Sequence, residues 1–126
     1  MRDVASETLD LSVIIPCYGE SQSIGNTVHR VHRYLTDHHI SHEIIVADDG
    51  SRDGTGTVVE ALKGRFPSLH LLALPHRGKG ASVREGMHHS RGALALFIDA
   101  DLSTPIEELP AFLEAASKGA DVVIAS

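Results

Sequence analysis

The amino-acid sequence predicts an α/β fold, doubly wound, in which helices cover both faces of a mainly parallel sheet. Short apolar runs rich in Val and Ile alternate along the chain with longer segments whose apolar residues recur at helical spacing. The connections are short, and the runs lack the polar alternation of a strand with one face in water. The chain has 126 residues, 42% of them hydrophobic, which is enough for one core.

The first two elements are a strand and a helix. Leu11–Pro16 is apolar, β-branched and too short for a helix, so it predicts a buried strand that ends at proline. A turn is expected at Cys17–Glu20. The segment Ser21–Asp37 then predicts an amphipathic helix, because its apolar residues recur every three or four positions. This stripe consists of Ile24, Val28, Val31 and Leu35.

A second strand, a loop rich in carboxylates and a second helix follow. Glu43–Ala47 is again a short apolar run, which predicts a buried strand. Asp48–Thr55 is dense in Asp, Gly and Ser, the residues that form turns. A helical stripe then returns at Val58, Val59, Leu62 and Phe66.

The next segments repeat this alternation. Ser68–Leu74 predicts a third strand, and Ala93–Ile98 predicts a fourth. Between them, Lys79–Ser90 predicts a third helix with a weaker apolar stripe at Val83 and Met87.

The remaining residues predict one more helix and one more strand. Pro105–Lys118 has a helical pattern, although Pro110 leaves the start of this helix open. Asp121–Ala125 predicts a fifth strand. Residues 1–10 are expected to form a polar extension and residues 11–126 a single domain, because no linker or repeat divides them.

Composition and charge exclude some classes of binding partner and indicate an expected location in the cell. The net charge of −6 argues against a nucleic acid held mainly through its phosphates, so an anionic ligand needs locally placed cations. Cys17 is the single cysteine, which excludes an intrachain disulfide framework. No apolar stretch approaches the roughly 18 residues of a membrane-spanning helix. The expected location is the cytoplasm, including the cytoplasmic face of a membrane.

In a doubly wound sheet, ligands bind beyond the carboxyl ends of the strands. The loops after the first, second and fourth predicted strands are therefore expected to meet in one crevice. These loops contain the residues whose types and spacing indicate chemistry.

Two aspartates end the fourth predicted strand. Asp99 and Asp101 are two positions apart, so on an extended backbone both carboxylates face the same side. Neighbouring carboxylates repel unless a cation lies between them, and oxygen ligands suit Mg²⁺ or Mn²⁺ that also contacts substrate phosphates. The alternative is that one of these aspartates caps the following helix.

A second acidic pair, Asp48 and Asp49, ends the second predicted strand. Successive side chains point to opposite sides, so one carboxylate can reach a ligand while the other anchors the loop. The alternative is turn formation alone, since Asp, Gly and Ser are common turn residues.

A basic, glycine-containing segment precedes the third predicted helix. His76–Gly80 places two cations and two glycines where backbone N–H groups and a helix N-terminus favour phosphate. It is not a Walker A loop, because Ala73 and Gly80 stand where that motif needs its first glycine and its hydroxyl. Gly54–Val59 is not a dinucleotide-binding fingerprint either, because Val59 replaces the third glycine.

Histidine and cysteine are not predicted to act in this chemistry. His38, His39, His88 and His89 lie at polar helix ends with no clear ligand geometry. No histidine lies beside Cys17 in the sequence, so this residue is interpreted as a packed structural thiol.

Four motifs follow one another along the chain, namely Val13–Glu20, Asp48–Thr55, Arg77–Gly80 with Arg84 and Gly86, and Asp99–Asp101. With these motifs in this order, the chain resembles the family 2 glycosyltransferases, which have the GT-A fold and transfer sugars from nucleotide donors with inversion. The resemblance extends from Leu11 to Ser126, and the run that starts at Asp99 is most similar to the dolichyl-phosphate glucose and mannose synthases, with the glucosyltransferases slightly favoured. One departure is Gly19, where the family usually has asparagine.

The resemblance implies roles for individual residues. Asp49, with Asp48, would contact the base or ribose, and Lys79 would support the donor. Asp101 would bind the divalent metal, Mg²⁺ or Mn²⁺, and Asp99 would contact ribose or complete the metal shell. The residues implied to line the nucleotide pocket are Pro16, Tyr18 and Glu20.

The implied function is transfer of a hexose from UDP-glucose or GDP-mannose to a polyprenyl or dolichyl phosphate, by in-line displacement at the anomeric carbon. Members of the family continue into an acceptor-binding half with a catalytic aspartate, so no catalytic base is expected in these residues. Without that half, the uncovered edge of the predicted sheet is expected to favour self-association. The alternative is a fragment that binds a nucleotide sugar and transfers nothing.

Overall fold

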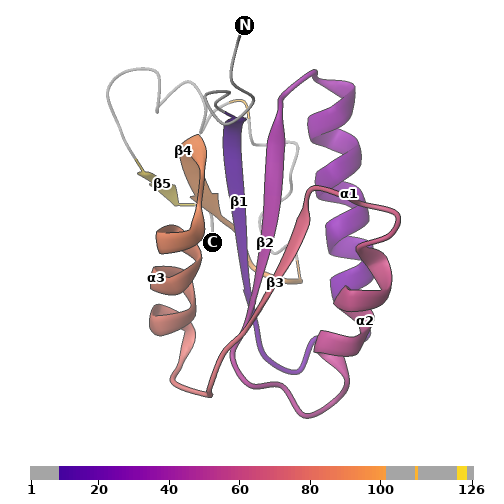
Figure 1. The fold of residues 1–126 in the computed structure, drawn as a ribbon, viewed down its shortest axis with the longest axis vertical. Helices are drawn as coiled ribbons and strands as arrows, with labels where there is room; N and C mark the ends of the chain where they lie inside the picture. The colour runs from indigo at the N-terminus through magenta and orange to yellow at the C-terminus, as the bar shows by residue number, and fades with distance from the viewer. Residues whose placement is uncertain (1–8, 102–109, 111–121, 125–126) are drawn as a thin grey trace, which may run out of the picture.

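The computed structural model describes residues 9–101, 110 and 122–124, which form a five-stranded sheet in the order β3-β2-β1-β4-β5 (Figure 1). All four strand pairings are parallel, as expected. The strands are β1 (Leu9–Cys17), β2 (His42–Asp48), β3 (Leu69–Ala73), β4 (Gly92–Phe97) and β5 (Val122–Ile124). The helices are α1 (Ile24–Asp37), α2 (Thr55–Leu62) and α3 (Lys79–His89).

Helices cover both faces of the sheet, with α1 and α2 on one face and α3 on the other (Figure 1). Side chains of β1 alternate between the two layers, so Val13 and Ile15 belong to the larger core under α1 and α2, whereas Ile14 belongs to the smaller core under α3. The predicted doubly wound α/β fold is therefore confirmed. The predicted stripe of α1 is fully buried, and it consists of Ile24, Val28, Val31 and Leu35.

Some element boundaries differ from the prediction. Strand β1 begins at Leu9 and continues through Cys17, because both ends still pair with neighbouring strands. Helix α1 begins at Ile24, three residues later than expected. Phe66 lies outside α2, which ends at Leu62, yet it is only 5% exposed. A turn that bonds the Phe66 N–H to the Leu62 carbonyl folds this ring back onto the core.

The buried face of α3 also differs from the predicted stripe. Val83 and Met87 are only partly buried, whereas Ser82 and Gly86 are buried. The reason is the close approach of α3 to the sheet, where Gly86 lies against Ile14 of β1. The helix predicted at 105–118 lies outside the described residues except for Pro110, and β5 falls within the strand predicted at 121–125.

A buried carboxylate ties three strands together at the amino edge of the sheet. Glu43, at the start of β2, accepts hydrogen bonds from the Ser12 hydroxyl at 2.7 Å and from the Arg91 N–H at 2.6 Å. The Ser12 oxygen in turn accepts the Gly92 N–H at 2.8 Å. Because a buried charge is costly unless it is hydrogen-bonded, these contacts favour one register for β1, β2 and β4.

At the opposite, carboxyl edge, Asp53 links the loop after β1 to the N-terminus of α2. One carboxylate oxygen accepts the Ser21 N–H at 3.1 Å, and the other accepts the Thr55 N–H at 3.2 Å and the Thr55 hydroxyl at 2.5 Å. These hydrogen bonds, first among them the one from the Thr55 hydroxyl, lower the pKa of Asp53 to about 2.

Gly19 connects the loop after β1 to the loop after β2, because its N–H donates to the Ser51 hydroxyl at 2.8 Å. Its φ of +69° lies in the left-handed region. Glycine adopts this conformation readily and asparagine tolerates it, so glycine at a position where the resembled family usually has asparagine preserves the turn.

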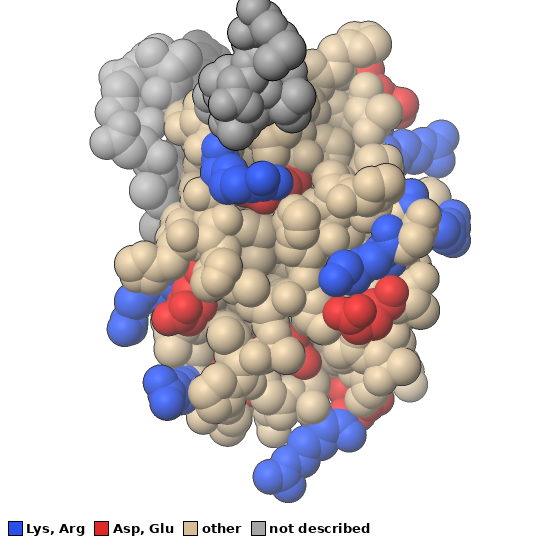
Figure 2. All heavy atoms as spheres, viewed as in Figure 1, with Lys and Arg blue, Asp and Glu red and all other residues tan. Residues whose placement is uncertain are grey.

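The described surface carries charges of both signs. On the face drawn in Figure 2, Lys and Arg side chains lie near Asp and Glu side chains and are separated by uncharged residues. No described helix is long and apolar enough to cross a membrane.

Replacing Gly86 with alanine should destabilise the fold. The new Cβ would lie 2.5 Å from the Cγ2 atom of buried Ile14, so we expect the free energy of unfolding to fall by about 1–3 kcal/mol in urea titrations. Gly80→Ala is the matched control on the same helix, since nothing lies within 4 Å of its added Cβ. The control should leave stability unchanged or raise it by up to about 1 kcal/mol, and equal effects of the two changes would contradict the packing described.

Replacing Asp53 with asparagine should change the pH dependence of stability. Because the folded-state pKa of Asp53 is lowered from 3.8 to about 2, ionised Asp53 stabilises the native chain above pH 3.8, and this contribution is lost as the pH falls toward about 2. The gap in Tm between the native chain and the Asp53→Asn variant should therefore narrow over that interval. A gap that stays constant would show that the carboxylate charge does not stabilise these loops.

Candidate functional site

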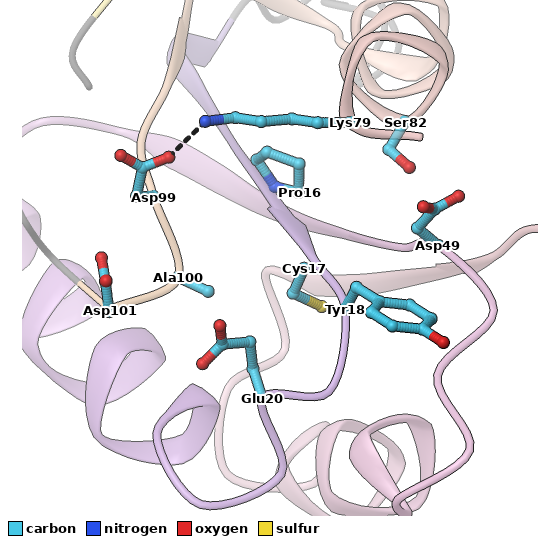
Figure 3. A pocket seen from close by; sticks show the side chains of 10 residues that line it. All are labelled: Pro16, Cys17, Tyr18, Glu20, Asp49, Lys79, Ser82, Asp99, Ala100 and Asp101. Atoms are coloured by element: carbon cyan, nitrogen blue, oxygen red, sulfur yellow. Dashed lines mark hydrogen bonds and ion pairs between the residues drawn. The ribbon is translucent and has the colours of Figure 1, made fainter. Parts of the chain in front are cut away.

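A pocket of about 270 Å³ lies at the carboxyl edge of the sheet, where β1 separates β2 from β4 (Figure 3). Residues from β1 and from the loops after β1, β2 and β4 meet there with the first turn of α3. The predicted convergence of three loops is therefore confirmed. The lining residues are Pro16, Cys17, Tyr18, Glu20, Asp49, Lys79, Ser82, Asp99, Ala100 and Asp101.

Strand pairing explains how these loops meet. Cys17 pairs with Asp48 on β2, and the Ile98 N–H extends the pairing of β4 by donating to the Ile14 carbonyl at 3.0 Å. The two acidic segments, which are about 50 residues apart in the sequence, therefore leave the sheet on either side of β1.

Asp48 differs from the other predicted site residues because it is absent from the pocket lining. It is 5% exposed and accepts hydrogen bonds from both the N–H and the hydroxyl of Ser51. Asp48 therefore anchors the loop, which corresponds to one of the two roles expected for the pair. The predicted residues that do line the pocket are Pro16, Tyr18, Glu20, Asp49, Lys79, Asp99 and Asp101.

Asp49 lies in the pocket wall and holds the segment before α3. Its carboxylate accepts the Arg77 N–H at 2.7 Å and the Gly78 N–H at 3.0 Å, and it lies 2.9 Å from Nδ1 of His76. Burial acts to raise the pKa of Asp49, but the two N–H groups and the imidazole outweigh burial and lower it. The backbone N–H groups of Arg77 and Gly78 were expected to face a phosphate, and they donate to Asp49 instead.

Lys79 and Asp99 form an ion pair across the pocket. The Lys79 Nζ and the Asp99 Oδ1 are 2.6 Å apart, and their side chains are 54% and 24% exposed (Figure 3). The ammonium group therefore lies beside the acidic segment that follows β4, although Lys79 belongs to α3. A polar ligand in the pocket would meet both signs of charge within a few ångströms of each other.

Glu20 and Asp101 extend the acidic side of the pocket (Figure 3). Between Asp99 and Asp101, the buried Ala100 offers its carbonyl to the Thr27 hydroxyl of α1, which holds this loop in place. Among the residues the structure describes, no three His, Cys, Asp or Glu side chains are grouped to hold a metal ion. Carboxylate oxygens nevertheless fit Mg²⁺ or Mn²⁺, which proteins often bind through one or two carboxylates together with substrate phosphates.

An aromatic pair that the sequence did not predict borders the pocket. The rings of Tyr18 and His76 stack with centroids 4.4 Å apart and an interplanar angle of 29°. Tyr18 is 51% exposed, which is unusual for a large hydrophobic side chain and leaves ring surface open to a ligand. The position of His76 at the start of the basic, glycine-containing segment was the available signal, but its stacking partner lies 58 residues earlier in the sequence.

Cys17 lines the pocket but is not a nucleophile. Burial, followed by the negative charges of Asp48, Glu20, Asp53 and Asp49, raises the pKa of the Cys17 thiol to about 12. The thiol is therefore protonated near neutral pH, which agrees with its interpretation as a structural residue.

Ser82 also lines the pocket, and the sequence did not reveal it. It is 1% exposed on the buried face of α3, in a helix whose predicted apolar stripe lay on other positions. No sequence motif marked it, because serine is common on helices and its burial depends on how closely α3 approaches β1.

Comparison with known proteins identifies the family. The model of Glycosyl transferase family 2 matches residues 12–126. An undecaprenyl-phosphate 4-deoxy-4-formamido-L-arabinose transferase of Pseudomonas aeruginosa is 36% identical over 115 residues, which are 90% of this chain and 34% of that protein. A dolichyl-phosphate beta-glucosyltransferase of Trichomonas vaginalis is 36% identical over 104 residues, covering 78% of this chain and 32% of that one.

A solved structure shares the fold. A mannosyltransferase from Pyrobaculum calidifontis, in complex with GDP-Man and Mn²⁺, has a TM-score of 0.68 at 26% identity over 84% of this chain and 31% of its own. The expected Rossmann-like, nucleotide-binding part of a GT-A fold is thereby confirmed. The chain spans about a third of the length of the curated relatives it matches. From its matching motifs and its fold, this chain belongs to glycosyl transferase family 2.

Proposed function

We propose that this chain forms the donor site of an inverting glycosyltransferase, which takes a hexose from a nucleotide sugar such as UDP-glucose or GDP-mannose. The observation that carries the proposal is the pocket where a cation, carboxylates and an exposed aromatic ring meet at the strand ends beside β1. Parallel α/β sheets bind nucleotides at this position. The bound GDP-Man in the mannosyltransferase of the same fold supports the choice of ligand.

In the proposed complex, the donor lies across the pocket, with its nucleoside toward Tyr18 and Asp49 and its diphosphate toward Lys79. The open ring surface of Tyr18 suits a planar base. Asp49 is ionised near neutral pH and accepts hydrogen bonds only, which suits the N–H or O–H groups of a base or ribose. Pro16 adds an apolar surface to the pocket wall, and Glu20, in the loop after β1, adds a carboxylate to it.

We further propose that Asp101, with Asp99 beside it, holds Mg²⁺ or Mn²⁺. Such an ion would supply positive charge that neutralises the diphosphate as it departs. Lys79, which reaches this segment from α3, supplies a second positive charge next to Asp99, with which it is paired in the structure. Two cationic groups beside the diphosphate would compensate for the excess of carboxylates in the pocket.

The proposed acceptor is a polyprenyl phosphate, because the undecaprenyl-phosphate and dolichyl-phosphate transferases similar to this chain are named for such acceptors. Its phosphate oxygen would attack the anomeric carbon in line as the sugar–phosphate bond breaks, and the nucleoside diphosphate would depart toward Lys79. The acceptor surface and any general base belong, on this proposal, to the part of the relatives that the chain does not match. A lipid-linked acceptor would bring the reaction to a membrane surface, for which we propose the cytoplasmic face.

Calorimetric titration of UDP-glucose and GDP-mannose, with and without Mn²⁺, tests the donor site. We expect one donor to bind in the presence of Mn²⁺, and Asp101→Ala to abolish this dependence on metal because a carboxylate ligand is lost. Asp37→Ala is the control, since this aspartate lies on the surface of α1 away from the pocket. The proposal fails if the folded chain binds neither donor, or if Asp101→Ala binds the donor and Mn²⁺ as the native chain does.

Replacing Lys79 with glutamine should weaken donor binding while preserving the side-chain length. Loss of a charge-assisted contact to the diphosphate is expected to raise Kd by about tenfold or more at constant Mn²⁺. Lys63→Gln provides the control, because Lys63 lies at the end of α2 and pairs with Glu60 on the surface. An unchanged Kd for Lys79→Gln would remove Lys79 from the proposed site.

A further inference from the structure

Ser82 is a buried hydroxyl in the pocket wall to which the proposed donor site assigns no role. It is 1% exposed, and its Oγ has no hydrogen-bond partner among the described residues. Serine in a helix commonly bonds a carbonyl one turn earlier, but the Ser82 hydroxyl does not, although its N–H donates normally to the Gly78 carbonyl at 3.2 Å. The same side chain lines the pocket.

An unpaired buried hydroxyl requires an explanation, because most buried polar groups in folded proteins have partners. Burial removes water from the hydroxyl, and the free-energy cost of this desolvation is not recovered while the hydroxyl has no hydrogen-bond partner in the pocket. A ligand atom that hydrogen-bonds to Ser82 would recover it without any further desolvation of the serine. The arrangement therefore favours ligand binding at the expense of the stability of the free protein.

The position of Ser82 within the pocket indicates which part of the ligand it meets. Figure 3 shows Ser82 beside Asp49, on the side of the pocket that also holds Tyr18, whereas the Lys79 side chain extends away to Asp99. The charged groups suited to a diphosphate and a metal ion thus lie on the other side. The side with Ser82 offers a hydroxyl, a carboxylate and an aromatic ring, which match the polar edges and flat face of a nucleoside.

We propose that the Ser82 hydroxyl hydrogen-bonds the nucleoside part of the donor and contributes to nucleotide affinity without contacting the diphosphate. The inference rests on the proposed function, because it assumes a nucleotide in this pocket. Asp49 can only accept hydrogen bonds, whereas the Ser82 hydroxyl can also donate. Together they recognise a ligand edge that carries both an N–H or O–H group and an acceptor oxygen or nitrogen.

The test compares Ser82→Ala with Ser68→Ala. The Ser68 hydroxyl is also buried and unpaired among the described residues, but it lies before β3 and does not line the pocket. Calorimetry with Mn²⁺ would measure the affinities of the full chain for UDP, GDP and inorganic pyrophosphate. A third variant, Ser82→Cys, keeps the size of the side chain but replaces the hydroxyl with a much weaker donor.

We expect Ser82→Ala to weaken binding of the preferred nucleoside diphosphate by about tenfold, with pyrophosphate affinity unchanged. Ser82→Cys should show a similar loss, and Ser68→Ala should bind as the native chain does. The Tm of ligand-free Ser82→Ala should equal or exceed that of the native chain, because an unpaired buried hydroxyl has been removed. A purely structural role would instead lower Tm and leave the nucleotide and pyrophosphate affinities in their native ratio.

Three outcomes overturn the proposal. The first is native nucleotide affinity in Ser82→Ala, which would leave the donor site intact and remove Ser82 from it. The second is an equal loss for pyrophosphate, which would place the serine at the phosphates. The third is that the native chain binds neither UDP nor GDP, in which case the proposed function fails together with this inference.

Discussion

The pairing of β1 with both β2 and β4, in parallel on both sides, is the constraint on which the rest of the structure depends. Parallel neighbours cannot be joined by a tight hairpin, so the chain must leave the carboxyl edge after each strand and return over a face of the sheet. The connection to β2 passes over one face through α1, whereas the chain enters β4 from α3 on the other. The loops therefore diverge beside β1 and leave room for a ligand between them.

Polar contacts, rather than apolar packing, fix the loops around that opening. Asp53 accepts a hydrogen bond from an N–H in the loop after β1, and Asp49 accepts one from an N–H in the segment before α3. The Thr27 hydroxyl of α1 donates to the carbonyl of Ala100. In each case a side chain satisfies backbone groups that the sheet and helices leave unpaired. Groups in the pocket wall are thereby positioned before a ligand arrives, which lowers the entropy that binding must overcome.

Sequence reasoning succeeded where the determining pattern is local. The apolar residues of α1 have helical spacing, so the buried face of this helix was predictable. Asp49 and Asp99 lie where apolar runs end, so their places at the strand ends were predictable too. It failed where burial depends on distant partners. Glu43 is buried because Ser12 and Arg91, 31 and 48 residues away, satisfy its charge. Ser82 faces the pocket because a glycine one turn later lets α3 approach β1 closely.

The carboxylate of Glu43 has a consequence for how such a chain can diversify. It favours one alignment of three strands at the edge of the sheet opposite the pocket, so that alignment does not depend on the sequence of the ligand-binding loops. Substitutions in those loops need not shift the strands past one another, since a one-residue slip would move every side chain of a strand to the opposite face of the sheet. The edge that contains Glu43 thus holds the strand alignment, while the loops around the pocket at the other edge can change without altering it.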